Sequence, residues 1–128
     1  MGEDVAAIRL LIVEDNQVFR EALELLLGLR SDIEVVASTA DGEAVVALCR
    51  EHEPDVVLMD YRLPGVDGVE ATRAITTAYP GVKVVALTAS ANREEMKALE
   101  EAGAVACLTK DQALDKIVAA IEGAAALA

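Results

Sequence analysis

The chain has 128 residues, and 54% of them are hydrophobic, which is enough apolar material for one domain with a buried core and excludes disorder of the whole chain. With 11 basic and 23 acidic side chains the formal net charge is −12, so the chain by itself is not expected to bind a nucleic-acid backbone. No apolar run approaches the roughly 18 residues of a membrane-spanning helix, and no signal peptide is recognisable at the start, which predicts a soluble cytoplasmic protein with no membrane partner.

Five short apolar runs alternate with five segments of helical period, always in the order strand then helix. The runs are Ile8–Val13, Ile33–Ser38, Val56–Met59, Lys83–Leu87 and Ala106–Thr109. Their apolar residues are nearly continuous, which is typical of strands that helices cover on both faces, the second run being the candidate for an edge. The pattern predicts an α/β domain built on a parallel sheet.

Four of the helical segments carry an apolar stripe at helical spacing. The stripes are Phe19, Ala22, Leu23 and Leu26; Val45, Leu48, Cys49 and His52; Ala71, Ala74, Ile75 and Ala78; and Leu114, Ile117, Val118 and Ile121. The predicted N-caps are Asn16, Asp41, Asp67 and Asp111. The fourth segment has only Met96 and Leu99, with a capping box from Asn92 to Glu95, so we expect the fourth helix to be weakly anchored and able to move.

Polar residues follow four of the predicted strands at their carboxyl ends. Glu14 and Asp15 come after the first strand, Asp60 after the third, Thr88 after the fourth and Lys110 after the fifth. Ligands of an open parallel sheet bind outside these ends, so we expect the five side chains to meet on one rim. Each residue alone has an ordinary explanation, as a helix-terminal acid, a turn residue or a surface charge, but their joint placement favours a site.

The chemistry of this rim points to phosphoryl transfer. Three carboxylates repel one another unless a cation compensates them, and an oxygen-only site open on one side suits Mg²⁺ completed by a phosphate. Asp60 is then the nucleophile, Lys110 neutralises charge, and the Thr88 hydroxyl donates to the new phosphoryl oxygen. Gly65 and Gly68 would let the backbone approach the crevice.

This constellation resembles the receiver domain of two-component response regulators over essentially the whole chain, Ile8 to about Gly123. The matching strings are Val13-Glu14-Asp15-Asn16, Asp55-Val56-Val57-Leu58-Met59-Asp60, Leu63-Pro64-Gly65-Val66-Asp67-Gly68, Leu87-Thr88-Ala89 and Lys110-Asp111. The leucine-rich first helix, Asp60-Tyr61-Arg62-Leu63-Pro64-Gly65 and the Asp after Lys110 look most like the NarL/LuxR-type branch. The resemblance implies one receiver domain over residues 1–128, with its core at about 8–123, and a flavodoxin-like doubly wound (βα)5 fold with strand order 2-1-3-4-5.

By that resemblance, Asp60 accepts a phosphoryl group from a phosphohistidine of a sensor histidine kinase. Mg²⁺ would be held by Glu14, Asp15, Asp60 and the main-chain carbonyl of Arg62. The phosphoryl oxygens would be received by the amides of Tyr61 and Ala89 and by Lys110. Such a domain is not an enzyme in the usual sense: it catalyses its own phosphorylation and slow dephosphorylation, and it regulates transcription through a DNA-binding output domain where the parent chain has one.

One position departs from the pattern of the family. Most receivers carry Tyr or Phe three residues before the lysine, and here that position is Cys107. A thiol cannot fill a ring-sized space, so the usual aromatic coupling is not expected. The hypothesis is that the signal passes through the loop after Thr88 and the fourth helix.

Other functions have weaker support from the sequence. A receiver-like docking or dimerisation module that ignores phosphate is the main alternative, and helices one and five are where a homodimer would form. A phosphatase with an aspartyl nucleophile would carry an acid where Arg62 stands, and a flavodoxin would not place Glu14 and Asp15 beside a flavin phosphate. His52 is interpreted as a helix-end residue, Cys107 as a small core residue, and the acids of the fourth helix (Glu94, Glu95, Glu100 and Glu101) as a solvated face.

Overall fold

The computed structural model describes residues 6–63, 65–89 and 92–127 and contains a five-stranded parallel sheet. The strands are β1 (Ile8–Val13), β2 (Ile33–Thr39), β3 (Val56–Asp60), β4 (Lys83–Thr88) and β5 (Ala106–Thr109). Their order is β2-β1-β3-β4-β5, which confirms the predicted fold class and topology. Strands β2 and β5 form the edges, and all four residues of β5 are only half-buried, so the fifth strand is less enclosed than its apolar sequence predicts.

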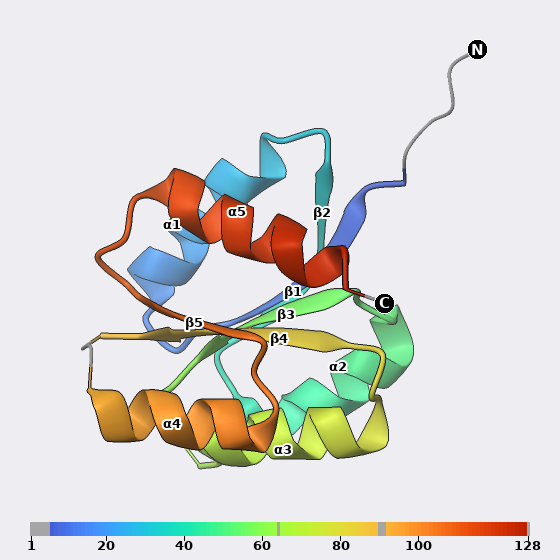
Figure 1. Cartoon of the computed structure of the whole chain (residues 1–128). Helices are drawn as coiled ribbons and strands as arrows, with labels where there is room; N and C mark the ends of the chain where they lie inside the picture. The colour runs from blue at the N-terminus through green and yellow to red at the C-terminus, as the bar shows by residue number, and fades with distance from the viewer. Residues whose placement is uncertain (1–5, 64, 90–91, 128) are drawn as a thin grey trace.

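The α-helices form two layers, one on each face of the sheet (Figure 1). They are α1 (Gln17–Gly28), α2 (Val45–His52), α3 (Gly68–Ala78), α4 (Arg93–Ala102) and α5 (Leu114–Ala125), and a short 3-10 turn (Gly42–Ala44) precedes α2. Helices α1 and α5 cover one face, and α2, α3 and α4 cover the other. Among the described residues, none of the helices has the length and apolar character needed to cross a membrane.

Alternation along the central strands divides the core into two halves. On β1, Leu10 and Ile12 pack into the half beneath α1 and α5, whereas Leu11 and Val13 pack into the half that faces the other three helices. All five residues of β3 are buried, including the charged one that ends it, Asp60. The fold therefore places a carboxylate at the buried end of a central strand.

The register between β1 and β2 is interrupted once. Leu10 pairs with Val35, but the next residue, Leu11, pairs with Ala37. Val36 is therefore an extra residue in the edge strand, as in a β-bulge.

The buried face of α1 differs from the predicted stripe. Leu23 and Leu27 are buried and Phe19 is half-buried, whereas Ala22 and Leu26 are exposed. The buried residues recur every four positions along one ridge of the helix, and the surplus apolar residues face solvent: Val18, Leu25 and Leu29. The stripe of α3 is likewise narrower than predicted, because Ala74 and Ala78 are exposed.

The predicted helix caps are confirmed at three positions and wrong at one. Asn16 and Asp67 cap α1 and α3 through side-chain oxygens, and Asp41 caps the 3-10 turn that leads into α2. Asp111 does not cap α5, which begins three residues later after Ala113. Its carboxylate accepts a hydrogen bond from the Thr109 hydroxyl, which holds it in the preceding turn.

Candidate functional site

Four polar side chains meet where the strands end. Glu14 follows β1, Asp60 ends β3, Thr88 ends β4 and Lys110 follows β5. Glu14 is 1% exposed, and Asp60 and Thr88 are each 2% exposed, which is unusual for residues of these types. Buried polar groups need partners, so their contacts show what the site is built to hold.

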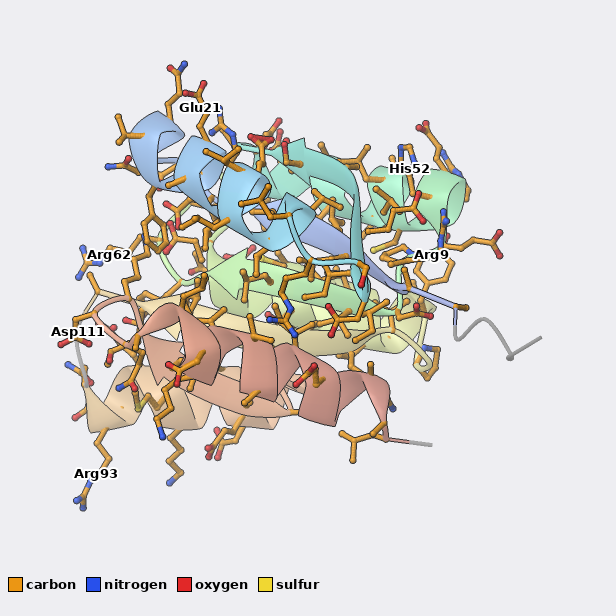
Figure 2. The ribbon with its side chains drawn as sticks, turned by 90° about the horizontal axis from the view of Figure 1, so that it is seen from above. Arg9, Glu21, His52, Arg62, Arg93 and Asp111 are labelled. Atoms are coloured by element: carbon orange, nitrogen blue, oxygen red, sulfur yellow. The ribbon has the colours of Figure 1, made fainter. Side chains whose placement is uncertain are left out.

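Figure 2 shows which residues lie at each end of the sheet. Arg62 and Asp111 lie at the end where the polar side chains gather, and Arg9 and His52 lie at the opposite end. The main-chain oxygen of His52 accepts a hydrogen bond from the Arg9 guanidinium at 2.6 Å. This placement fits the predicted role of His52 as a helix-end residue rather than a catalytic one.

Lys110 joins two of the buried carboxylates. Its Nζ lies 2.9 Å from Oε1 and 3.0 Å from Oε2 of Glu14, and 3.2 Å from Oδ1 of Asp60. Burial lowers the pKa of Lys110, but Glu14 and Asp60 outweigh it, so the pKa is raised and the ammonium form is favoured. The ring of Phe19 in α1 lies 5.3 Å from Nζ, within range of a cation–π contact.

The loop between β1 and α1 holds Glu14 in place. The backbone N–H of Asn16 donates to Oε2 of Glu14 at 3.0 Å, and the guanidinium of Arg20 donates to its main-chain oxygen at 2.8 Å. Asn16 also accepts the hydrogen bond that caps α1. The same short segment therefore begins the helix and orients the carboxylate.

Asp60 has a strongly perturbed acidity. Burial, then the neighbouring carboxylates of Asp15 and Glu14, raise its pKa from 3.8 to about 7, while Lys110 acts in the opposite direction. The N–H of Arg62 lies 3.3 Å from Oδ1, whereas the buried Oδ2 accepts no hydrogen bond from the described part of the chain. Asp60 thus keeps one oxygen available for a ligand.

These carboxylates have the composition of a divalent-cation site. One oxygen from each of Glu14, Asp15 and Asp60 lies within 4.8 Å of the other two, and Asp15 is exposed, so the cluster is open on one side. Oxygen ligands in small number are what Mg²⁺ takes when a phosphate and waters complete its coordination. The residues present therefore fit the predicted cofactor.

A glycine lets the loop after β3 fold closely against the site. The N–H of Gly68 donates to the main-chain oxygen of Tyr61 at 2.9 Å, and a Cβ at Gly68 would lie 2.4 Å from the main-chain oxygen of Asp60. A side chain would force this loop apart, as expected from the sequence. Pro64, part of the same motif, lies outside the described residues.

Thr88 is connected to α4 by a residue that the sequence analysis assigned to solvent. The Thr88 hydroxyl donates to Oε1 of Glu95 at 3.2 Å, and Nη2 of Arg62 lies 3.8 Å from Oε2 of the same residue. A cavity of about 340 Å³ opens here, lined by Tyr61, Arg62, Leu63, Asp67 and Glu95. The space is large enough to admit a small polar group beside the loop that follows Asp60.

Residues 10–122, which include every candidate site residue described above, match the sequence profile of the family described as the response regulator receiver domain. The chain belongs to that family. The resemblance predicted from the motifs is thereby confirmed, and this receiver domain has the β2-β1-β3-β4-β5 sheet that the resemblance implied.

The relatives of this receiver domain include longer regulators. It is 37% identical over 115 residues to the transcriptional regulatory protein DegU of Brevibacillus brevis, covering 90% of this chain and 49% of that protein. It is 40% identical over 114 residues to the transcriptional regulatory protein LnrK of Bacillus subtilis, covering 89% of this chain and 52% of that protein. The receiver domain thus spans about half the length of the curated relatives it matches.

Solved structures give the same assignment. The signal receiver domain of the response regulator NarL from Mycobacterium tuberculosis superposes with a TM-score of 0.90 and 30% identity, covering 94% of this chain and 98% of that one. A LuxR-family two-component response regulator from an Aurantimonas species superposes with a TM-score of 0.89 and 34% identity, covering 94% and 86%. The predicted likeness to the NarL/LuxR-type branch is therefore confirmed.

The structure brings together the side chains that the sequence predicted and adds two more. Glu14, Asp15, Asp60, Thr88 and Lys110 all lie on one rim of the receiver domain, as expected. Phe19 was predicted only as a core residue and Glu95 only as part of a solvated face, so the contact of Phe19 with Lys110 and that of Glu95 with Thr88 were not expected. The only signal for Glu95 was its place in the capping box begun by Asn92.

Cys107, where most receiver domains have an aromatic ring, packs beneath α4. Its thiol is half-buried and lies 3.8 Å from the main-chain oxygen of Met96. Burial, with a smaller effect of Glu100, raises the pKa of this thiol to about 11, so it is mostly protonated near neutral pH. Cys107 therefore connects β5 to α4 as a small core residue.

Proposed function

We propose that this receiver domain, a single domain with its core at about residues 8–123, accepts a phosphoryl group on Asp60 from a phosphohistidine of a sensor histidine kinase, with Mg²⁺ bound. The observation that carries the proposal is one half-buried lysine, Lys110, in contact with the buried carboxylates of both Glu14 and Asp60, beside an acid cluster that a cation would neutralise. Membership of the receiver family supports the same reaction.

In the transfer, a carboxylate oxygen of Asp60 attacks phosphorus, the P–N bond to the kinase histidine breaks, and its electron pair remains on the imidazole nitrogen. The attacking group is the ionised carboxylate, which a pKa of about 7 leaves partly protonated near neutrality. Glu14, Asp15, Asp60 and the main-chain carbonyl of Arg62 would hold Mg²⁺, which supplies charge neutralisation at the carboxylates and the phosphoryl oxygens. Slow hydrolysis by water then restores the carboxylate, so the domain promotes both its own phosphorylation and its reset.

The phosphoryl oxygens need donors on the protein side. Lys110 already lies 3.2 Å from Oδ1 of Asp60 and can pair with a phosphoryl oxygen without large movement. The Thr88 hydroxyl and the main-chain amides of Tyr61 and Ala89 are the other proposed donors. Their rearrangement around the new charge would alter the adjacent surface and so change binding to a partner.

The cellular role follows from the named relatives. DegU and LnrK are described as transcriptional regulatory proteins and are about twice as long as this chain. We therefore assign this receiver to the cytoplasmic control of transcription, acting on DNA through an output domain where the parent chain has one. The charge of −12 opposes direct DNA binding by the receiver itself.

The test is intact mass spectrometry after incubation with an acyl phosphate such as acetyl phosphate. Wild type with Mg²⁺ should gain the mass of one phosphoryl group, and wild type without Mg²⁺ or Asp60→Asn with Mg²⁺ should gain little. Asp55→Asn, at the opposite end of the same strand, is the matched control and should behave as wild type. Equal labelling of Asp60→Asn and wild type would exclude Asp60 as the acceptor.

A second candidate is a docking or dimerisation module that does not depend on phosphate. It is favoured by the apolar residues that α1 leaves at the surface, since Val18, Leu25 and Leu29 are 80%, 65% and 75% exposed and lie near one another around the helix. Light scattering of wild type and Leu25→Glu would test a homodimer formed through α1. A dimer that is lost in Leu25→Glu, in protein that acetyl phosphate does not label, would favour this candidate over the first.

A further inference from the structure

One acid of α4 differs from the others in where its side chain lies. Glu94, Glu100 and Glu101 are exposed, as a solvated helix face predicts, but the side chain of Glu95 is only 17% exposed. Asn92 fixes the first turn of this helix by accepting hydrogen bonds from the N–H groups of Glu94 and Glu95. Glu95 is thus held at the start of α4 with its carboxylate directed toward the strands.

The carboxylate of Glu95 connects α4 to the end of β4 and to the loop after β3. Its Oε1 accepts the hydroxyl of Thr88 at the end of β4 at 3.2 Å, and its Oε2 lies 3.8 Å from the guanidinium of Arg62 in the loop after β3. The Arg62 side chain is 78% exposed, so solvent screens this ion pair and it contributes little. The bond from Thr88 is shielded and has a charged acceptor, so it is the stronger restraint.

A hydroxyl has one proton to donate, and this fact creates a competition at Thr88. While the proton points to Glu95, it cannot be given to an oxygen of a phosphoryl group on Asp60. We propose that Glu95 is a positioning residue that restrains the unphosphorylated state, and that phosphorylation transfers the Thr88 hydrogen bond from the Glu95 carboxylate to the phosphoryl group and so releases the first turn of α4. The proposal rests on the proposed phosphorylation of Asp60.

This contact also offers a route for the signal in a chain without the usual aromatic ring. The thiol of Cys107 in β5 contacts the main-chain oxygen of Met96, the residue that follows Glu95. The first turn of α4 is therefore linked to β4 through Glu95 and to β5 through Cys107. Release of the first link leaves the first turn with the weaker, sulfur-mediated one, while the buried Leu99 still anchors the later part of the helix.

The experiment compares Glu95→Ala with Glu94→Ala, which removes the same charge from the same helical turn but from an exposed side chain, and so serves as the matched control. Beryllium fluoride, a tetrahedral mimic of a phosphoryl group on a carboxylate, is titrated in the presence of Mg²⁺. Because Thr88 no longer has to leave Glu95, Glu95→Ala should bind the mimic about tenfold more tightly than wild type. Glu95→Gln keeps an uncharged acceptor, so its affinity for the mimic should lie between those of wild type and Glu95→Ala. The affinity of Glu94→Ala should match that of wild type.

Two further measurements separate positioning from a merely structural effect. In a Thr88→Ala background, Glu95→Ala should no longer change the affinity for the mimic, because the two residues act through one hydrogen bond. In the ligand-free protein, amide hydrogen exchange in the first turn of α4 should be faster in Glu95→Ala than in Glu94→Ala. Equal affinities of Glu95→Ala and Glu94→Ala, or an effect that persists without the Thr88 hydroxyl, would overturn the proposal.

Failure of the proposed function would look different. Wild type that binds no beryllium fluoride and takes no phosphoryl group from acetyl phosphate would refute phosphorylation at Asp60. The exchange experiment needs no phosphoryl group, and equal exchange in Glu95→Ala and Glu94→Ala would then refute the Glu95 restraint independently.

Discussion

Replacement of Asp60 by asparagine is expected to stabilise the metal-free protein at neutral and alkaline pH. Burial and two neighbouring carboxylates raise the pKa of Asp60 from 3.8 to about 7, so the folded chain holds this proton more tightly than the unfolded chain does. The stabilisation that wild type gains from the proton is complete below the unfolded pKa and is lost as the pH rises through the folded pKa. Asparagine resembles the protonated acid at every pH and avoids this loss.

The size of the effect follows from the shift. At about 1.36 kcal/mol per pKa unit, ionising Asp60 in the folded protein costs about 4 kcal/mol at most, and water entering beside the carboxylate lowers this cost. We therefore expect Asp60→Asn to be more stable than wild type by about 2–4 kcal/mol at about pH 8, and to differ little at about pH 4.

Urea denaturation in the presence of a chelator, repeated across this pH range, measures the difference, with Asp55→Asn as a control acid at the other end of β3. Added Mg²⁺ should then stabilise wild type by about 2.7 kcal/mol at a concentration of one hundred times Kd, and Asp60→Asn by much less. Stability profiles of wild type and Asp60→Asn that run parallel with pH would show that ionising Asp60 does not destabilise the fold. Equal stabilisation of both proteins by Mg²⁺ would show that Asp60 does not bind the ion.

Three other predictions follow from the structure. Lys110→Ala leaves the Glu14 carboxylate buried without its cation and should lower the urea-derived stability by about 2–4 kcal/mol near neutral pH; a loss under about 0.5 kcal/mol would contradict the ion pair. Gly68→Ala places a Cβ 2.4 Å from the main-chain oxygen of Asp60 and should lower the free energy of unfolding by about 2 kcal/mol or more. Gly81→Ala is the control: a Cβ there meets nothing within 4 Å, so the free energy of unfolding should change by less than about 1 kcal/mol. Burial raises the pKa of the Cys49 thiol to about 11, so iodoacetamide should leave it unmodified in the native protein and alkylate it in urea, as read by intact mass.

The strands were predictable because continuous apolar runs between polar turns have few other interpretations. Both ends of β1 and β5 match the prediction, and β2, β3 and β4 each extend one residue further than predicted, to Thr39, Asp60 and Thr88. The helix faces were harder to predict. In α1 nearly every position from 22 to 29 is apolar, so the sequence lacks the contrast between faces from which a stripe is identified, and only packing selects Leu23 and Leu27.

The site was predictable to the extent that topology determines it. Parallel strands end on one edge, so Glu14, Asp60 and Lys110 had to approach one another whatever the details of the loops. Glu95 and Phe19 belong to helices, and the direction of a helical side chain depends on how its helix docks. The pair Glu94-Glu95 looks uniform in the sequence, and the way α4 packs on the sheet places one carboxylate inward and leaves the other in solvent.

Because β2 contains the extra residue Val36, the residues before and after it pack against different layers of helices. Before Val36 the strand sends Val35 into the core half beneath α1 and α5, and after it Ala37 packs into the opposite half. The inserted residue thus reverses the sidedness of the strand part-way along, so that Ser38 points to α1 and its hydroxyl donates to Glu24. Deletion of Val36 would make Val35 and Ala37 direct neighbours that face opposite halves, as they do now, so Ser38 should keep its bond to Glu24. A strand that kept Val36 in regular alternation would instead turn Ser38 away from α1 and break this hydrogen bond to the helix.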